Sequence, residues 1–165
     1  MIQSPPSLRP LLERLRSTLP HPDLVPPLLA VGQDQSSLPP TQMQLAVAYT
    51  GSQRSQQALD LTLCLAHQTR LATGRTVQVH ILHVAHPEHL EQSIGVMTQA
   101  LTLAQEWCGT VQIHRRVGNV ATELGDLLEQ TAVHLLVVGC HSAHHPLIRQ
   151  LHPYRCPILG IPELP

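Results

Sequence analysis

Four consecutive aliphatic residues, Leu135 to Val138, constrain the fold of this chain more than any other feature. A strand with one face in water alternates apolar and polar side chains, and this run does not alternate. Such a run suits a central strand of a parallel sheet, because helices then cover both of its faces. The sequence therefore predicts an α/β protein built around a buried parallel sheet.

Strand-like and helix-like segments alternate around this run. Strands are expected at 45–49, 76–84, 111–117, 135–138 and 157–161, with helices at about 53–73, 87–108 and 120–131 and a short helix before the last strand. These helices are long enough for the right-handed crossovers that join neighbouring parallel strands. We therefore expect a five-stranded, parallel, doubly wound sheet.

The helix expected after Pro87 carries a regular apolar pattern. Pro87 suits the first turn of a helix, and Glu88 is favourable there against the helix dipole. Gly109 is expected to stop this helix. Its apolar residues step by four and three positions and so lie on one helical face: Leu90, Ile94, Met97, Leu101, Ala104 and Cys108.

The first 42 residues differ from the rest and hold nine of the fifteen prolines. Residues 10–19 could form a short amphipathic helix, and residues 33–42 resemble a polar linker. We therefore divide the chain into a proline-rich N-terminal arm, 1–42, and a folded domain, 43–165. We expect the arm to pack on its own domain; the alternative is a docking segment for a protein partner.

Composition excludes several functions. All ten basic residues are arginine, so the chain can have neither a lysine-containing phosphate loop nor a lysine Schiff base. A formal net charge of −1 gives no electrostatic basis for binding nucleic acid or anionic lipid. The four cysteines form no CxxC pair, and we see no signal peptide and no apolar run that could span a bilayer. We expect a cytoplasmic protein with reduced thiols.

Glycine-containing turns follow three of the expected strands. They are Tyr49-Thr50-Gly51-Ser52, Gly118-Asn119 and Gly139-Cys140-His141-Ser142. In a doubly wound sheet, ligands bind beyond the carboxyl ends of the strands, where the strand order reverses. Each turn also precedes a helix N-terminus, where free amide groups favour anions. The three turns therefore predict a nucleotide cleft at one rim of the sheet.

Other chemistries find less support. A crowded loop offers possible ligands for zinc or copper, namely Cys140, His141, His144 and His145, with His152 and Cys156 nearby. Its spacing fits no standard closed zinc site, so we assign no metal ligand. Cys140 at a strand end could be a reactive thiol, although a small buried hydrophobe is the commoner role. No acid–base pair or nucleophile arrangement emerges, and we assign no catalytic residue.

Four short motifs, in the correct order between about residues 43 and 162, resemble the universal stress protein family. Val47 to Leu59 is similar to its V-A-x-D-G-S-x-x-S-x-x-A-L signature, and Gly118 to Leu128 to its G-x-P-A-x-x-I helix entry. His134 to Gly139 resembles D-L-I-V-M-G, and Cys156 to Leu159 resembles the C-P-V-L of the last strand.

This resemblance implies a Rossmann-like or flavodoxin-like fold and a homodimer joined through the last strand, 157–161. It also implies that ATP or AMP is the candidate ligand. The candidate nucleotide-binding residues are Tyr49, Thr50, Gly51, Ser52, Val84, Gly118, Gly139 and Ser142. Val84 is included as the end of the second expected strand, where the family tends to line its adenine pocket.

The chain departs from the family pattern at the phosphate loop. ATP-binding members carry G-x-x-G, nine residues, and then G-[ST], whereas here Ser142 stands at the second glycine and no G-[ST] precedes Cys156. Thr50 replaces the aspartate of the first motif. Without those glycines the chain lacks a backbone amide nest for phosphate. We expect ATP binding to be weak or lost.

The favoured hypothesis is a non-catalytic, stress-response regulatory module that acts through dimerisation and partner binding. The alternative is an ATP-dependent adenylating enzyme of the ATP pyrophosphatase type, because Thr50 to Ser55 distantly resembles the S-G-G-x-D-S loop of those enzymes. Arg54 stands where that loop has its aspartate, and the chain has no lysine to neutralise a leaving pyrophosphate.

Overall fold

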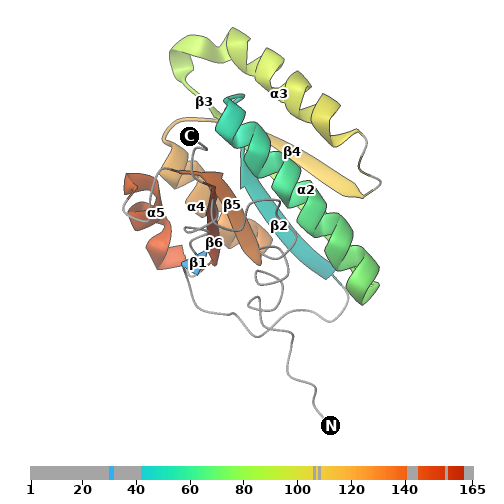
Figure 1. Cartoon of the computed structure of the whole chain (residues 1–165). Helices are drawn as coiled ribbons and strands as arrows, with labels where there is room; N and C mark the ends of the chain where they lie inside the picture. Colours follow the sequence, from blue (N-terminus) through green and yellow to red (C-terminus); the bar gives the residue numbers. More distant parts are fainter. Residues whose placement is uncertain are drawn as a thin grey trace.

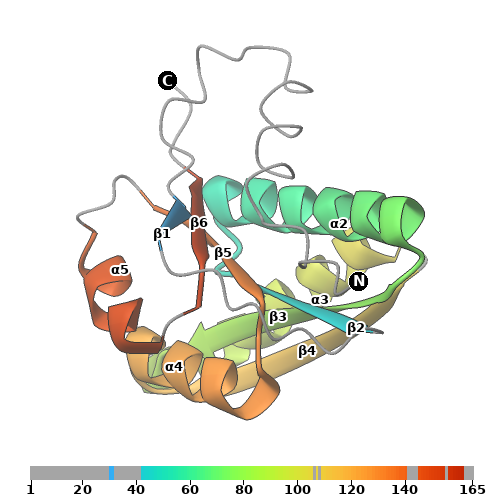
Figure 2. The same ribbon diagram turned by 90° about the horizontal axis from the view of Figure 1, so that it is seen from below.

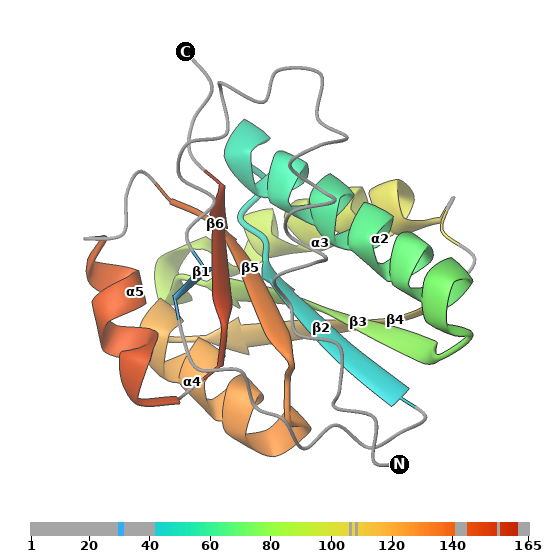
Figure 3. The same cartoon turned by 60° about the horizontal axis from the view of Figure 1, so that its bottom comes forward.

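The computed structural model describes residues 30–31, 42–105, 107, 109–140, 145–154 and 156–161, and the body of its sheet is parallel. The five parallel strands lie in the order β6-β5-β2-β3-β4 (Figure 3). Their bounds are β2 (Gln42–Ala48), β3 (Thr76–Ala85), β4 (Thr110–Val117), β5 (Leu135–Gly139) and β6 (Ile158–Ile161). The predicted five-stranded, doubly wound sheet is confirmed.

A sixth strand comes from the segment that we predicted to be an arm. The two-residue strand β1 (Ala30–Val31) runs antiparallel to β6, with Ala30 opposite Leu159 and Val31 opposite Ile158. It therefore occupies the outer edge of β6. The helix expected at 10–19 lies outside the described residues, as does the linker expected at 33–42 apart from Gln42, which begins β2.

Helices cover both faces of the sheet (Figures 1 and 2). On one face lie α2 (Gln53–Thr73) and α3 (Leu90–Ala104), the latter preceded by the 3₁₀ turn η2 (Pro87–His89). On the other face lie α4 (Val120–Thr131) and α5 (Pro146–Leu151), followed by η3 (His152–Tyr154). No described helix is both long and apolar enough to cross a membrane.

Two apolar cores result, one on each side of the sheet. The core beneath α2 and α3 contains Leu45, Val47, Leu59, Val79, Ile81 and Val137. The core beneath α4 and α5 contains Ala46, Leu82, Leu124, Leu127, Leu136 and Ile158. Neighbouring residues of β5 fall into different cores, which explains why its aliphatic run does not alternate.

Local signals fix the ends of α2 where the sequence predicted them. The Ser52 side chain accepts a hydrogen bond from the Ser55 amide, which caps the first turn. Gly74 adopts a left-handed conformation, with φ of 67°, and its amide donates to the Arg70 carbonyl at 2.9 Å. The predicted helix 53–73 is confirmed.

The helix α3 departs from expectation. It ends at Ala104, five residues before the glycine that we expected to stop it. Three of its larger apolar residues, Leu90, Ile94 and Leu101, are exposed, whereas Val96 and Leu103 pack against the core beneath α2 and α3. The predicted apolar face is therefore divided, because its large residues Leu90, Ile94 and Leu101 are exposed while Ala104 is buried. Periodicity alone could not tell which part of that face meets the sheet.

Three polar side chains, one each from β2, β3 and β4, are hydrogen-bonded in a row on the α4 side of the sheet. The Nδ1 atom of His80 lies 3.0 Å from Nε2 of His114, and its Nε2 lies 2.6 Å from Oε1 of Gln44. Since a carbonyl oxygen only accepts, Nε2 of His80 donates to Gln44 and Nδ1 accepts from His114. Burial lowers the pKa of His80 to about 4, with a smaller contribution from His114. These are hydrogen-bonded structural histidines.

Candidate functional site

The turn between β2 and α2 forms one side of the predicted crevice. Gly51 has φ of 82°, a conformation that glycine adopts without steric cost. The Thr50 hydroxyl donates to Oγ of Ser52 at 2.9 Å, and the Gln56 side-chain amide donates to the Gly51 carbonyl at 3.4 Å. This turn is well ordered by its own hydrogen bonds, but it presents hydroxyl groups and no carboxylate.

Tyr49 contributes its backbone to this rim and its ring to the core. Its side chain is 1% exposed and belongs to the core beneath α2 and α3. Its amide donates to the Leu82 carbonyl at 2.8 Å, and its carbonyl accepts from Nδ1 of His83 at 2.9 Å. The ring therefore does not offer a surface on which a base could stack.

The other side of the crevice is the end of β5, at Gly139. The chain builds β2, β3 and β4 outward in one direction and returns to place β5 on the opposite side of β2. The strand order therefore reverses between β2 and β5, which is where ligands bind in such sheets. The structure brings the turn from Thr50 to Ser52 and Gly139 to this one point.

An arginine that the sequence analysis did not select as a site residue lies in that crevice. A Cβ atom placed on Gly139 would stand 2.6 Å from Cγ and 2.9 Å from Cδ of Arg54. The aliphatic part of Arg54, in the first turn of α2, therefore occupies the space above Gly139. Arg54 follows the glycine turn by two residues, and the strand opposite it ends in glycine. This combination is the sequence signal from which its place in the crevice could have been predicted.

Two further predicted site residues lie on the neighbouring strands. Val84 is half-buried near the end of β3 and packs against the core beneath α4 and α5. Gly118 follows β4, the last strand on that side, with φ of 142°, and its amide donates to the Ala85 carbonyl at 3.4 Å. Both positions belong to the same rim of the sheet, but neither borders the gap between β2 and β5.

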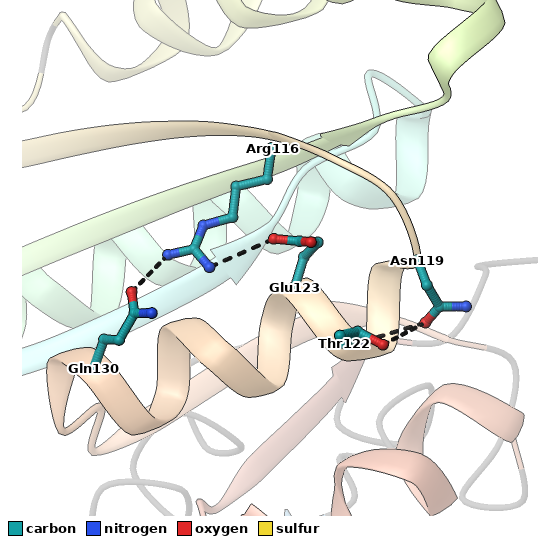
Figure 4. A network of polar contacts seen from close by, with 5 residues as sticks. All are labelled: Arg116, Asn119, Thr122, Glu123 and Gln130. Atoms are coloured by element: carbon teal, nitrogen blue, oxygen red, sulfur yellow. Dashed lines mark hydrogen bonds and ion pairs between the residues drawn. The ribbon is translucent and has the colours of Figure 1, made fainter.

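Side-chain contacts hold the Gly118 turn to the first helix after it (Figure 4). Oδ1 of Asn119 accepts from the Thr122 amide at 3.2 Å, so Asn119 is the N-cap of α4. Arg116 of β4 lies 3.5 Å from Glu123 and donates to Gln130 at 2.9 Å (Figure 4). Glu123 therefore has a structural partner in Arg116.

The loop after β5 is described in part. Ser142, the remaining candidate nucleotide residue, lies outside the described residues, as do His141 and His144. Cys140 is 2% exposed, and its sulfur would lie 2.5 Å from a Cβ on Gly160. Burial raises the pKa of the Cys140 thiol, although Arg54 acts in the opposite direction. Cys140 therefore behaves as a small core residue rather than as a reactive thiol.

Two of the hypothetical metal ligands, Cys156 and His145, have structural roles. Burial raises the pKa of Cys156 to about 12, which disfavours the thiolate that a metal would need. Nδ1 of His145 accepts from the Leu147 amide at 3.2 Å and so caps α5. Within the described residues, side chains that could share an ion are instead His86, Glu88 and His89, all exposed in the turn after β3.

Among the comparisons with known proteins, the one with solved structures identifies the fold. No family model matches the chain, and no curated protein matches it. Among solved structures, a universal stress protein family member from Burkholderia pseudomallei has a TM-score of 0.59 at 24% identity, over 73% of this chain and 96% of its own. The universal stress protein of Archaeoglobus fulgidus has a TM-score of 0.58 at 17% identity, over 73% of this chain and 94% of its own.

Some of the similar structures hold nucleotides. A universal stress protein family protein from Arabidopsis thaliana, solved with AMP bound, has a TM-score of 0.55 at 15% identity, over 74% of this chain and 92% of its own. A universal stress protein was solved in complex with cAMP; it has a TM-score of 0.56 at 19% identity, over 73% of this chain and 96% of its own. The resemblance inferred from the motifs is thus confirmed at the level of structure: this chain has the fold of the universal stress proteins.

Proposed function

We propose that this protein is a non-catalytic regulatory module of the universal stress protein type, in which binding of adenine nucleotides is weak or lost. It acts in the cytoplasm through its conformation and its assembly with other chains. The observation that carries this proposal is the position of Arg54, whose aliphatic part fills the crevice above Gly139.

The two sides of the crevice support this reading. The turn from Thr50 to Ser52 keeps the glycine and the helix cap that a nucleotide-binding rim requires. On the other side, Gly139 leaves room for close approach, but Arg54 takes that room. Structures with this fold were solved with AMP and with cAMP, but they share less than 25% sequence identity with this chain. Adenine nucleotides are therefore the ligands to be tested.

The first experiment asks whether the protein carries or binds a nucleotide. Mass spectrometry of the denatured, purified protein is expected to find no AMP, ADP or ATP, and calorimetric titration with Mg-ATP is expected to show no tight binding. A stoichiometric amount of retained nucleotide, or tight magnesium-dependent binding of ATP, would contradict the proposal.

A variant tests the role of Arg54 directly. Arg54→Ala removes the side chain from the crevice, so its affinity for AMP is expected to rise severalfold above that of the wild type. The matched control is Arg149→Ala, which removes an exposed arginine in α5 and is expected to leave AMP binding unchanged. A fall in affinity on Arg54→Ala would instead make Arg54 a phosphate ligand.

A different measurement distinguishes the alternative function, an ATP-dependent adenylating enzyme, from the proposed one. Such an enzyme releases pyrophosphate from ATP when an acceptor is present, and the proposed module releases none. Release that depends on Thr50 or Ser52 would favour the enzyme.

Assembly into a homodimer is part of this proposal. The resemblance points to the last strand as the interface, but β1 already lies antiparallel along the outer edge of β6. A second copy could pair with this edge only after β1 had left it, because both would need the same backbone groups. Docking of the N-terminal arm, residues 1–42, on a protein partner stays the alternative hypothesis.

A further inference from the structure

The helix α3 leaves three large apolar side chains exposed. The exposed fraction is 41% for Leu90, 60% for Ile94 and 50% for Leu101, while Met97 is half-buried. The sheet side of α3 is formed by Ser93, Ala100 and Ala104, which are buried, and by Val96 and Leu103, which are half-buried against the core. We call Leu90, Ile94, Met97 and Leu101 the α3 stripe.

The α3 stripe lies on the flank of α3 that faces away from α2. A Cβ atom on Gly51, at the start of α2, would meet Val96 and Gln99 at 3.4 Å, so these two residues mark the flank next to α2. Positions 94 and 96 point about 200° apart around a helix, which places Ile94 on the other side. Figure 1 shows α3 at the margin of the molecule, and among the described elements none lies beyond it.

The polar groups of α3 do not require water at this surface. The Thr98 hydroxyl donates to the Ile94 carbonyl and the Thr102 hydroxyl to the Thr98 carbonyl, both at 2.9 Å. Glu91 is the one charged residue between Leu90 and Ala104. Covering this flank therefore desolvates little polar surface, and no row of like charges repels a partner.

The spacing of the α3 stripe is the same in both directions along the helix. Its four residues are separated by four, three and four positions, which is the a/d spacing of a helix seam. In an antiparallel pair of such helices, Leu90 of one copy faces Leu101 of the other, and Ile94 faces Met97. An interface with a twofold axis requires this kind of self-complementarity.

We propose that the α3 stripe is the homodimer interface of this protein, with the α3 helices of two copies packed antiparallel about a twofold axis. This inference rests on the homodimer in the proposed function and places its interface at α3, because β1 covers the edge of β6. Four apolar side chains from each copy make a small interface, so the dimer dissociates at micromolar rather than nanomolar concentration.

The test is the mass of the full-length protein in solution, measured by sedimentation equilibrium over a range of concentrations. The wild type is expected to rise from the mass of one chain, 18.1 kDa, towards that of two. The double variant Ile94→Glu/Leu101→Glu is expected to stay at the mass of one chain. The matched control Leu71→Glu changes an exposed leucine of α2, 65% exposed and outside the α3 stripe, and is expected to dimerise like the wild type.

Cross-linking tests the antiparallel arrangement. In a Cys64→Ser background, which removes an exposed thiol, Leu90→Cys/Leu101→Cys is expected to form disulfide-linked dimers on mild oxidation. Leu90→Cys alone is expected to form few, because the two copies of residue 90 lie at opposite ends of the interface. Circular dichroism on every variant establishes that it is folded.

Two results would overturn the proposal. One is a wild type that stays at the mass of one chain at every concentration measured. The other is a folded Ile94→Glu/Leu101→Glu variant that still dimerises, which would return the interface to β6. A wild type that stays at the mass of one chain would also remove the homodimer from the proposed function, whereas a variant that still dimerises would overturn the α3 interface alone. Neither result bears on the nucleotide measurements above.

Discussion

The helices α2 and α3 cover the same face of the sheet, but they use their apolar residues in opposite ways. In α2, Ala58 and Leu59 are fully buried and Leu63 nearly so. In α3, the fully buried residues are small, and three large ones, Leu90, Ile94 and Leu101, are exposed. The α2 helix packs over the central strands β2, β3 and β5, whereas α3 packs over β3 and the edge strand β4. The helix α3 lies at the margin of the molecule, and no element that the structure describes covers its second flank (Figure 1).

The largest expected effect concerns the core beneath α2. Leu59→Ala is expected to lower the free energy of unfolding by about 2–5 kcal/mol, because it removes a fully buried side chain and leaves a cavity. Denaturant unfolding measures this change. A loss below about 1 kcal/mol would mean that α2 is not the main cover of this face.

Acid sensitivity is the next largest effect, and it comes from His80, which lies on the opposite, α4 side of the sheet. The folded pKa of His80 is about 4 and its unfolded value is near 6.5, so between these pH values the unfolded chain binds the additional proton. Stability is therefore expected to fall as the pH drops from 7 to 4, by about 3 kcal/mol from His80.

Unfolding measurements at several pH values check this expectation. His80→Gln is expected to make the pH dependence shallower, whereas His67→Gln, at an exposed position of α2, serves as the control. An unchanged slope in His80→Gln would show that other groups cause the acid sensitivity.

A smaller effect is expected where the first turn of α2 meets β5. Gly139→Ala is expected to cost about 1–3 kcal/mol, because its Cβ would overlap the Arg54 side chain. The double variant Arg54→Ala/Gly139→Ala is expected to recover most of this loss. A double-mutant cycle of unfolding free energies measures the coupling, and additive effects would place Arg54 outside the crevice.

The smallest effect is expected at Leu71, an exposed leucine of α2 that lies outside the α3 stripe. Leu71→Gln, in the last turns of α2, is expected to change the unfolding free energy by less than about 0.5 kcal/mol. Its sedimentation mass is expected to match that of the wild type. A change in mass would extend the dimer interface to α2.

Much of the fold could be predicted because its signals are local. The unbroken aliphatic run at 135–138 indicated a buried parallel strand, and Ser52, Gly74 and Asn119 mark helix ends through their own hydrogen bonds. The β1 strand could not be predicted in this way. Its two residues carry no period of their own and are recognisable as a strand only by their pairing with β6.

The candidate site could be predicted in part. The turn from Thr50 to Ser52 and Gly139 are recognisable in the sequence because glycine permits close approach and tight turns. That Arg54 fills the crevice was not foreseen, because residues 54 and 139 become neighbours only when β5 inserts beside β2.

By itself, the sequence determined the α/β class, the parallel sheet and the absence of lysine-based phosphate chemistry, since these follow from periodicity and residue type. Only the tertiary structure decided which flank of α3 meets the sheet, which edge of the sheet is covered and which side chain occupies the crevice. The physical reason is that periodicity defines a face relative to its own helix axis, whereas burial depends on what the rest of the chain places against that face.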